Sequence, residues 1–420
     1  MHILVFSHYY PPEVNAPASR MSENCKVWAD AGHEVTVITC VPNHPRGKVY
    51  SGYQNRVYQS ETVDGVRIVR VWTYLAANAG FARRIANYLS YMISALSVLP
   101  WIKRPDIILS TSPQFFCGLT GMVAKWIYRA PWVLDVRDLW PESIVSVGAM
   151  PRGFVVRRLE DIETFAYNQA DHIVSVTDAF VPHIAERLKT AKPISVVKNG
   201  VHPSLFRTSN TSADVKARFD LQGRFVASYV GTHGLAHGLD TVLQAADRLR
   251  DNPQIGFLLV GDGAERHRLI KTAQKMQLDN IRIVGQLPKA EMPGIWSATD
   301  ASLIVLKRSD TFKKVLPSKM FEAMAMECPI VLGVEGEAKA LLDVSGAGIA
   351  ITPGDADALA KGVKRLSEDP ALAKRCGARG RAHVCAYFNR RILAERYLDI
   401  LTAEHLNSTP SRIDQGRRAY

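Results

Sequence analysis

At 420 residues the chain is longer than one ordinary hydrophobic core supports, so two domains are predicted. Hydrophobic residues make up 47% of the chain and charged residues 22%, a composition that excludes an intrinsically disordered protein. The 52 Lys and Arg residues against 40 Asp and Glu residues give a net charge of +12. This excess favours anionic partners such as nucleotides and phospholipid headgroups.

The cysteines and the first residues indicate a reducing compartment. Six cysteines are scattered without a CxxC pair, which favours free thiols over a disulfide framework. The opening MHILVFSHYY has neither a basic leader nor a cleavage site, so we interpret it as a first buried strand. We therefore expect a cytoplasmic protein.

In chain order, seven short runs rich in β-branched residues alternate with helical stretches in the first half of the chain. These predicted strands cover residues 3–7, 34–40, 66–72, 106–110, 132–136, 172–177 and 194–197. The pattern restarts in the second half at residues 225–231, 256–261, 281–285, 301–306, 329–334 and 348–352. Each run is continuously apolar, as in parallel strands buried on both faces. The sequence therefore predicts an α/β protein with two doubly wound, Rossmann-like domains, whose ligands bind at the carboxyl ends of the strands in the cleft between the domains.

A polar segment separates the two series of strands. Residues 198–214, KNGVHPSLFRTSNTSAD, are rich in Asn, Gly, Pro, Ser and Thr, as connections between domains are. We place an N-terminal domain at 1–205 and a C-terminal domain at 206–385. Residues 386–420 are expected to form a helix that packs back toward the N-terminal domain, followed by a frayed tail.

An apolar run at 88–102 lies in a stretch without acidic residues between Val66 and Pro105. About fifteen residues are too few to span a bilayer, which needs roughly 20. Basic residues on both sides and Trp101 fit a helix that lies in the membrane interface. A helix packed on the sheet explains the run equally well.

The segment 316–332, LPSKMFEAMAMECPIVL, carries the most information about a ligand. A loop that ends in Pro317 and Ser318 opens a helix, whose free N–H groups and dipole favour phosphate. Lys319 adds a cation in the first turn, and Glu322 lies one turn further, where a carboxylate can accept hydrogen bonds from a ribose. Alternatively, Ser318 is only a helix cap and Glu322 a solvated charge.

Two glycine turns precede that segment, each between a strand and a helix. In the first, Gly231, Gly234 and Gly238 allow a close approach of the backbone to a diphosphate, and His233 and His237 can donate hydrogen bonds. Taken singly, the histidines are as well explained as surface or capping residues. The second turn, Gly261 to Gly263, we interpret as mainly architectural.

In the N-terminal half, LDVRDLWPES places Arg137, Asp138 and Glu142 on the loop after a buried strand. Asp138 is our candidate for the group that orients or deprotonates an acceptor, assisted by Arg137, with Glu142 as an acceptor contact. A salt bridge that shapes the loop is the alternative. Asn15 and Arg20 open a helix after the first strand and are predicted either to contact the acceptor or the donor phosphate, or only to cap the helix.

As a set these motifs resemble GT-B glycosyltransferases of family four. The order VGTHGLAHGLDTVLQAA, LLVGDGAERHRL, VGQLPKAEMPGIWSATDASLIVL and LPSKMFEAMAMECPIVLG resembles their C-terminal domain. SHYYPPEVNAPASR, WADAGHEVTVITCVPNHPRGKVYSGY and LDVRDLWPES resemble the bacterial subgroup that assembles O-antigen, colanic acid and capsule, including N-acetylfucosaminyltransferases. The resemblance extends over about residues 1 to 400.

The resemblance implies that Glu322 holds the donor ribose, that Lys319 and the turn from Gly231 to Gly238 hold the diphosphate, and that the turn at 285–288, with Leu287, lies against the base. Two positions depart from the family pattern. Lys314 stands where members often carry an acid, and Thr232 and His237 occupy a turn that often carries Arg and Lys. Further cations for the diphosphate are therefore sought among Lys313, Lys314 and Arg308.

The resemblance further implies transfer with retention of configuration, from a UDP-sugar by analogy, to a lipid-linked saccharide at the inner face of the membrane. No metal and no cofactor are expected, and the sequence has no His and Cys cluster with the spacing of metal ligands. Nucleic acid is not an expected partner, because aromatic residues do not interleave with the basic ones. The main alternative is a nucleotide-sugar epimerase on the same fold. A dehydrogenase is disfavoured because the first strand runs into HYYPPE rather than GxGxxG.

Overall fold

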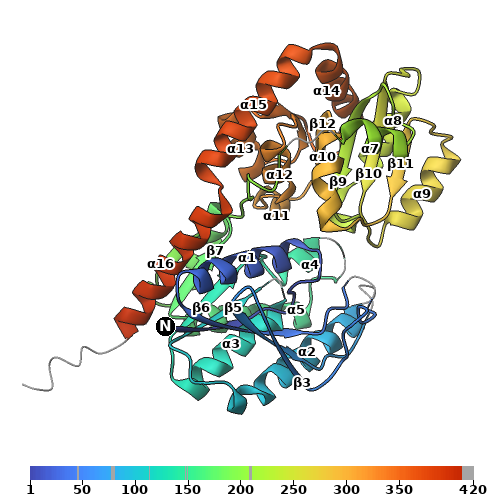
Figure 1. The fold of residues 1–420 in the computed structure, drawn as a ribbon. Coiled ribbons are helices and arrows are strands. Elements are labelled where there is room, and N and C mark those ends of the chain that lie inside the picture. The colour runs from blue at the N-terminus through green and yellow to red at the C-terminus, as the bar shows by residue number, and fades with distance from the viewer. Residues whose placement is uncertain are drawn as a thin grey trace, which may run out of the picture.

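The computed structural model describes residues 1–44, 47–76, 81–112, 114–146, 148, 150–207 and 211–408. Two α/β domains are stacked one above the other, each a twisted sheet with helices on both faces (Figure 1). This is the predicted architecture of two doubly wound domains. The expected frayed tail from residue 409 onward lies outside the described residues.

The N-terminal sheet has eight strands in the order β3-β4-β2-β1-β5-β6-β7-β8, and every pair is parallel except β3 with β4. The strands are β1 (His2–Phe6), β2 (Glu34–Cys40), β3 (Tyr58–Val63), β4 (Val66–Val71), β5 (Ile107–Thr111), β6 (Trp132–Val136), β7 (His172–Ser175) and β8 (Ile194–Val196). The helices are α1 (Ala16–Asp30), α2 (Phe81–Ser97), α3 (Phe115–Tyr128), α4 (Glu142–Ser146), α5 (Phe154–Gln169) and α6 (Val181–Ala185), with 3₁₀ turns η1 (Leu99–Trp101) and η2 (Asp178–Phe180).

Strand β3 is the one element of this sheet that the analysis of the sequence did not predict. It lies at the edge and its sequence, YQSETV, is polar, so it lacks the apolar run of the buried strands. It pairs antiparallel with β4 through a two-residue turn in which Asp64 and Gly65 both have positive φ, 51° and 76°. Asp-Gly is the preferred sequence for such a turn, and this dipeptide was the available signal.

The C-terminal sheet has six parallel strands in the order β11-β10-β9-β12-β13-β14. They are β9 (Phe225–Val230), β10 (Ile255–Val260), β11 (Ile281–Val284), β12 (Ala301–Val305), β13 (Ile330–Gly333) and β14 (Gly348–Ala350). The helices are α7 (Ser212–Arg218), α8 (Asp240–Arg248), α9 (Arg266–Lys275), α10 (Met292–Ser297), α11 (Asp310–Lys313), α12 (Lys319–Ala325), α13 (Glu337–Ser345), α14 (Ala356–Glu368) and α15 (Pro370–Tyr387), with 3₁₀ turns η3 (Leu235–His237) and η4 (Lys289–Glu291).

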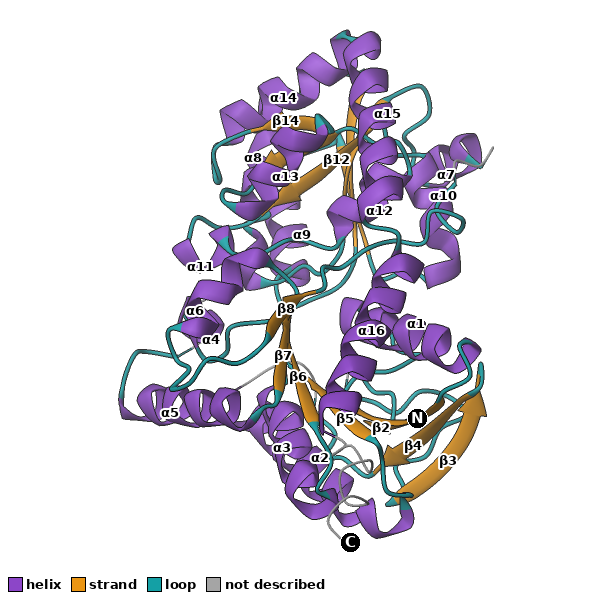
Figure 2. Cartoon of the chain, turned by 90° about the vertical axis from the view of Figure 1, so that its left-hand side faces the viewer, coloured by secondary structure: helices purple, strands orange, loops and turns teal. Residues whose placement is uncertain are grey.

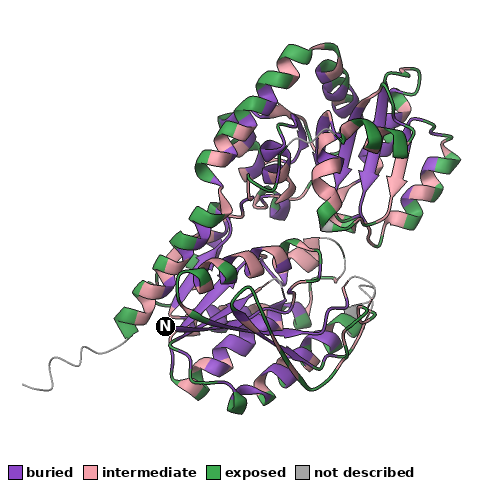
Figure 3. Cartoon of the chain, viewed as in Figure 1, coloured by how far each residue is buried: buried purple, intermediate pink, exposed green. Residues whose placement is uncertain are grey.

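Burial explains why the strands could be recognised as continuous apolar runs in the sequence. The inner strands of both sheets are buried along their length, while the outward sides of the helices are exposed (Figure 3). Large aromatic side chains complete the cores, among them Trp132 in the N-terminal domain and Trp296 in the C-terminal domain, both fully buried. Each domain therefore has its own hydrophobic core.

The last helix, α16 (Arg390–Ser408), leaves the C-terminal domain and packs beside α1 of the N-terminal domain (Figure 2). Trp28 of α1 donates from Nε1 to the Ala394 carbonyl at 2.9 Å. The chain passes between the domains twice, and the two connecting segments lie side by side. Val201 N of the first segment donates to the Phe388 carbonyl of the second at 3.0 Å. A side chain at Gly200 would stand 2.3 Å from that carbonyl, so the crossing requires glycine.

Candidate donor and acceptor site

The start of α12 brings the predicted donor residues to the interface between the domains. Ser318 precedes the helix, but its side chain makes no capping hydrogen bond. Instead Asn199, from the segment that connects the domains, donates to Ser318 Oγ at 3.2 Å. Ser318 therefore links the donor helix to the connection between the domains.

Lys319 is the cation of this site. Its Nζ is buried and has no hydrogen-bond partner among the described residues. The amine lies 3.6 Å from the centroid of the Tyr229 ring, and a Cβ at Gly231 would stand 3.1 Å from it. Burial lowers the pKa of Lys319 to about 7, against the opposing effect of Glu322. The charged form of this buried amine lacks a partner, so a bound anion would stabilise it.

The two histidines of the first glycine turn surround the same amine. His233 is fully buried, and neither of its ring nitrogens has a hydrogen-bond partner among the described residues; the same holds for Nδ1 of His237. Burial, and then the charge of Lys319, lowers the pKa of His233 to about 4 and the pKa of His237 well below its usual value. Both rings are therefore neutral at pH 7, and each has one N–H to donate.

The glycines hold the turns close together. A Cβ at Gly261 would stand 1.8 Å from the Gly231 carbonyl oxygen, and one at Gly263 would stand 2.5 Å from the His233 carbonyl oxygen. Gly234 opens the 3₁₀ turn η3, which carries His237. The geometry of Gly261 and Gly263 agrees with the architectural interpretation of the second turn.

Glu322 lies one turn along α12. Trp296 donates from Nε1 to Glu322 Oε2 at 3.3 Å, which orients the carboxylate. Leu287 is half-buried and packs on the hydrophobic cluster that contains Trp296. Arg308 is exposed, which places it further into solvent than Lys319.

Arg266 was missed by the analysis of the sequence. It begins α9 directly after the second glycine turn, and its Nε is buried without a hydrogen-bond partner among the described residues. A Cβ at Gly285 would lie 3.7 Å from Arg266 Nη2, so the guanidinium faces the predicted base-binding turn. The only available signal was a basic residue after a glycine turn, which many surface helices also have.

Asp138 is half-buried on the loop after β6. Ser143 donates to Asp138 Oδ2 at 2.9 Å, and burial raises the pKa of Asp138 to about 6. Beside it lies a cavity of about 30 Å³ lined by apolar side chains, including Leu134, Val136 and Trp140. These apolar walls disfavour the charged carboxylate, so Asp138 has a pKa suited to accept a proton near neutral pH.

Arg137 interacts with Asp135 and not with the predicted partner Asp138 among the described residues. Its charge is balanced mainly by Asp135, which also lies 3.6 Å from Nε of Arg20. Burial lowers the pKa of Arg137 to about 10, and its Nε and Nη1 are buried without a partner among the described residues. The side chain thus belongs to a buried charge cluster, and no contact with Asp138 supports the predicted assistance.

Asn15 caps α1, as the alternative for it stated, whereas Arg20 has a structural role that was not predicted. Arg20 donates to the Val197 carbonyl at 2.8 Å and to Asn199 Oδ1 at 3.1 Å, and it is 3% exposed. These contacts attach α1 to the connection between the domains and disfavour the acceptor role of Arg20. Asn15 caps α1 by accepting from Ala18 N at 2.8 Å.

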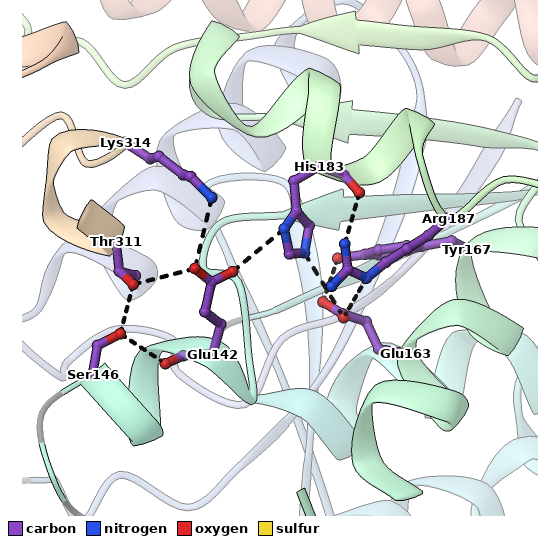
Figure 4. A network of polar contacts seen from close by, with 8 residues as sticks. All are labelled: Glu142, Ser146, Glu163, Tyr167, His183, Arg187, Thr311 and Lys314. Carbon is purple, nitrogen blue, oxygen red and sulfur yellow. Dashed lines mark hydrogen bonds and ion pairs between the residues drawn. The ribbon is translucent and has the colours of Figure 1, made fainter. Parts of the chain in front are cut away.

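Glu142 bridges the two domains instead of facing an open acceptor site (Figure 4). Its Oε2 lies 3.3 Å from His183 Nδ1 in the N-terminal domain. Its Oε1 accepts from Thr311 Oγ1 at 3.3 Å and lies 3.6 Å from Lys314 Nζ, both in the C-terminal domain. Ser146 and Thr311 complete the bridge with a hydroxyl contact of 2.5 Å. The acceptor contact predicted for Glu142 is therefore disfavoured, because its carboxylate is already occupied.

Two other cations proposed for the diphosphate, Lys313 and Lys314, are paired with carboxylates. Lys314 has Glu142 as its partner, and Lys313 lies 2.7 Å from Asp310.

Among the described residues no group of three or more His, Cys, Asp or Glu side chains is placed to hold a metal ion. Within the same part of the chain, no helix has the length and apolar character needed to cross a membrane.

Comparisons with known proteins identify the family to which the chain belongs. Residues 15–200 match the family model for a glycosyl transferase 4-like domain, and residues 213–383 match that for glycosyl transferases group 1. WcaI of Escherichia coli K12, named for colanic acid biosynthesis, is 27% identical over 87% of this chain and 92% of its own length. The 2-deoxystreptamine glucosyltransferase of Streptomyces kanamyceticus is 30% identical over 61% of this chain and 67% of its own.

Solved structures show the same fold. Sucrose-phosphate synthase of Thermosynechococcus elongatus superimposes with a TM-score of 0.76 at 19% identity, over 97% of this chain and 99% of its own. HepE of Anabaena, solved with UDP-glucose, gives a TM-score of 0.73 at 16% identity, over 96% and 100%. The two stacked domains are thus those of a GT-B enzyme, and the chain belongs to the group 1, family 4-like glycosyltransferases.

Proposed function

We propose that the chain transfers a sugar from a UDP-sugar to a lipid-linked saccharide during the assembly of a surface polysaccharide. The observation that carries this proposal is the set of buried, unpartnered donors around Lys319, His233 and His237. Unsatisfied buried polar groups are costly, so their concentration at one place indicates a ligand. A diphosphate satisfies a cation and two neutral N–H donors together.

The donor roles follow from position. Lys319 and the turn at Gly231 and Gly234 neutralise the departing diphosphate, and Arg266 extends the positive surface toward the base. Glu322, oriented by Trp296, accepts from the ribose. UDP is the proposed nucleotide because HepE was solved with UDP-glucose and shares the fold. These groups need no metal to stabilise the leaving group.

On the acceptor side, Asp138 orients the attacking hydroxyl. Its raised pKa allows it to share the acceptor proton, while the leaving phosphate takes up the negative charge on the same face of the sugar. This arrangement gives retention of configuration, which the anomeric coupling of the product in an NMR spectrum tests. A product with the inverted anomer excludes it.

A surface polysaccharide is proposed because WcaI is named for colanic acid and other relatives are named for lipopolysaccharide core and capsule synthesis. The relatives cited are transferases, which disfavours the epimerase alternative. Incubation with the donor alone distinguishes the two, since an epimerase forms the epimeric nucleotide sugar without an acceptor.

A thermal-shift screen of UDP, ADP and GDP sugars tests the donor site. We expect stabilisation by a UDP-sugar that Glu322→Ala loses, because the variant lacks the ribose acceptor. Glu327→Ala is a matched control, since Glu327 is an exposed carboxylate just beyond the end of the same helix. Equal stabilisation of all three proteins would remove Glu322 from the site.

The membrane contact is proposed for the side of the N-terminal domain formed by α2, α3 and α5. One face of α2 is buried through Tyr88 and Tyr91, which fits the packed-helix alternative, while Ile93 on the other face is 68% exposed. Neighbouring α3 and α5 add exposed apolar residues, and basic residues surround them; the exposed apolar residues are Trp126, Ile127, Phe154, Val155 and Phe165. We propose that this surface lies on the inner face of the cytoplasmic membrane.

Flotation with phosphatidylglycerol vesicles tests that contact. We expect wild type to float and Ile93→Ser to float less, because the apolar surface is interrupted. Val344→Ser is the control, since Val344 is also a largely exposed apolar residue but lies on the C-terminal domain. Failure of wild type to float would overturn the membrane proposal and leave the donor site untouched.

A further inference from the structure

Arg84 is an accessible cation that the donor site does not use. It lies in the first turn of α2, with its side chain exposed. Among the described residues its guanidinium has one hydrogen-bond partner, the hydroxyl of Tyr88 at 3.3 Å, and no carboxylate within salt-bridge distance. An arginine with free donors beside a binding site is available to an anionic ligand.

Tyrosine and histidine side chains form one cluster with this arginine. Tyr88 and Tyr9 both pack edge-on against the buried ring of His8, at centroid distances of 5.4 and 4.9 Å. Tyr9 in turn contacts His44 at 5.2 Å. Tyr9 follows β1 and His44 follows β2, so the cluster lies at the carboxyl ends of neighbouring parallel strands, where ligands of such sheets bind.

The charges of the cluster suit an oxyanion. Burial and the positive charge of Arg84 lower the pKa of His44 to about 4, so the imidazole is neutral at pH 7. Although the Arg84 side chain is exposed, the residues around its guanidinium desolvate it in part and disfavour its charge, but Tyr88, Tyr9 and Asp138 favour the charge and raise the pKa of Arg84. The cluster thus combines one permanent cation with neutral O–H and N–H donors, and Asp138 is within electrostatic reach of it.

We propose that Arg84, with Tyr9, Tyr88 and His44, binds the diphosphate of a lipid-linked acceptor and thereby places the acceptor sugar beside Asp138. The inference rests on the proposed transfer to such an acceptor. Helix α2 supports it, because Leu89 and Ile93 are exposed on its outer face and offer an apolar path for the lipid. Arg84 is accordingly a binding residue for the part of the acceptor that does not react.

Geranyl diphosphate is the probe, titrated by calorimetry in the presence of saturating UDP so that the donor site is occupied. We expect Arg84→Ala to weaken its binding roughly 10- to 100-fold, the loss typical of a charge-assisted contact. Arg83→Ala is the matched control, because Arg83 is the exposed neighbour with the same charge. It should change binding less than about twofold, as expected for a screened surface charge.

Two further probes distinguish a diphosphate site from a site for the lipid alone and from a site for a carboxylated sugar. Geraniol tests the lipid part alone, and its weaker binding should be equal in all variants. Arg84→Lys should retain part of the affinity for the diphosphate, which shows that the variants fold and that charge is what matters. Methyl glucuronide tests whether the cluster instead selects a carboxylated sugar.

Equal losses in Arg83→Ala and Arg84→Ala would overturn the inference, as would Arg84-dependent binding of methyl glucuronide but not of geranyl diphosphate. Binding of geranyl diphosphate that disappears when UDP is added would also overturn it, because the probe then occupies the donor site. The proposed function fails by a separate result, namely that UDP itself neither binds nor stabilises the protein.

Discussion

The charged groups near Lys319 and those near Glu142 lie at the same domain interface but are satisfied to different degrees. Around Lys319 the amine and three imidazole nitrogens are buried without partners among the described residues. Around Glu142 the carboxylate already contacts His183, Thr311 and Lys314. Because folding already pairs the Glu142 carboxylate, its role is to hold the domains together. The polar atoms around Lys319 have no such partners, which favours a ligand at that place.

The largest effect that tests this comparison is expected for Lys319→Ala. Removal of the one buried, unpaired amine should weaken UDP binding roughly 100-fold, since charge-assisted hydrogen bonds to the diphosphate are lost. Calorimetric titration with UDP measures it. Lys313→Ala is the control, because Lys313 is exposed and paired with Asp310. Equal losses in the two variants would show that general positive charge, and not the buried amine, binds the nucleotide.

The pH dependence of donor binding should be the next largest effect. With a pKa of about 7 in the free protein, Lys319 loses its proton as pH rises through 7, whereas a bound diphosphate favours the charged amine. Affinity should therefore be constant at pH values well below 7 and fall by up to about tenfold per pH unit above it. UDP-glucose is the suitable ligand, because its diphosphate diester does not titrate in this range.

Lys319→Arg, with a side chain that stays charged, should remove most of this slope. The facing histidines, His233 and His237, do not account for it, because burial lowers the pKa of each ring so far that both are already neutral at pH 7. A slope that persists in Lys319→Arg would assign the titration to another group.

A smaller effect is expected for Glu142→Gln, which keeps the shape of the interdomain bridge but removes its charge. Loss of the pairing with Lys314 and His183 should cost about 1 kcal/mol, or roughly fivefold in donor affinity if the bridge holds the binding arrangement. The melting temperature measures the loss of stability, and the UDP affinity measures the loss of donor binding. Glu395→Gln, at an exposed pair within α16, is the control. An unchanged affinity with a lowered melting temperature would limit the bridge to stability.

The smallest effect is expected for Arg308→Ala. Arg308 was predicted to bind the donor, but its side chain is exposed and its charge is screened by solvent. We expect UDP affinity to fall about twofold or less, measured by the same titration. A loss as large as that of Lys319→Ala would show that the donor draws Arg308 into the site and would weaken the comparison of paired and unpaired cations.

The sequence by itself determined the order of strands and helices and the segments that carry chemistry. Buried parallel strands are continuously apolar, so all thirteen predicted runs correspond to strands of the two sheets. The polar edge strand β3 lacks that signal and was visible only through its Asp-Gly turn. Lys319 and Glu322 could be proposed as donor-binding residues because their positions follow from a loop that opens a helix.

Only the tertiary structure decided which polar residues have partners. Arg20, Glu142 and Lys314 are chemically as suitable for binding as Lys319, and in the sequence nothing separates them. Their partners come from segments more than a hundred residues away, as in the contacts of Arg20 with Val197 and of Glu142 with Lys314. Long-range packing sets such distances, and a local pattern cannot encode them. For the same reason Arg266 and Arg84 became candidates only once their surroundings were known.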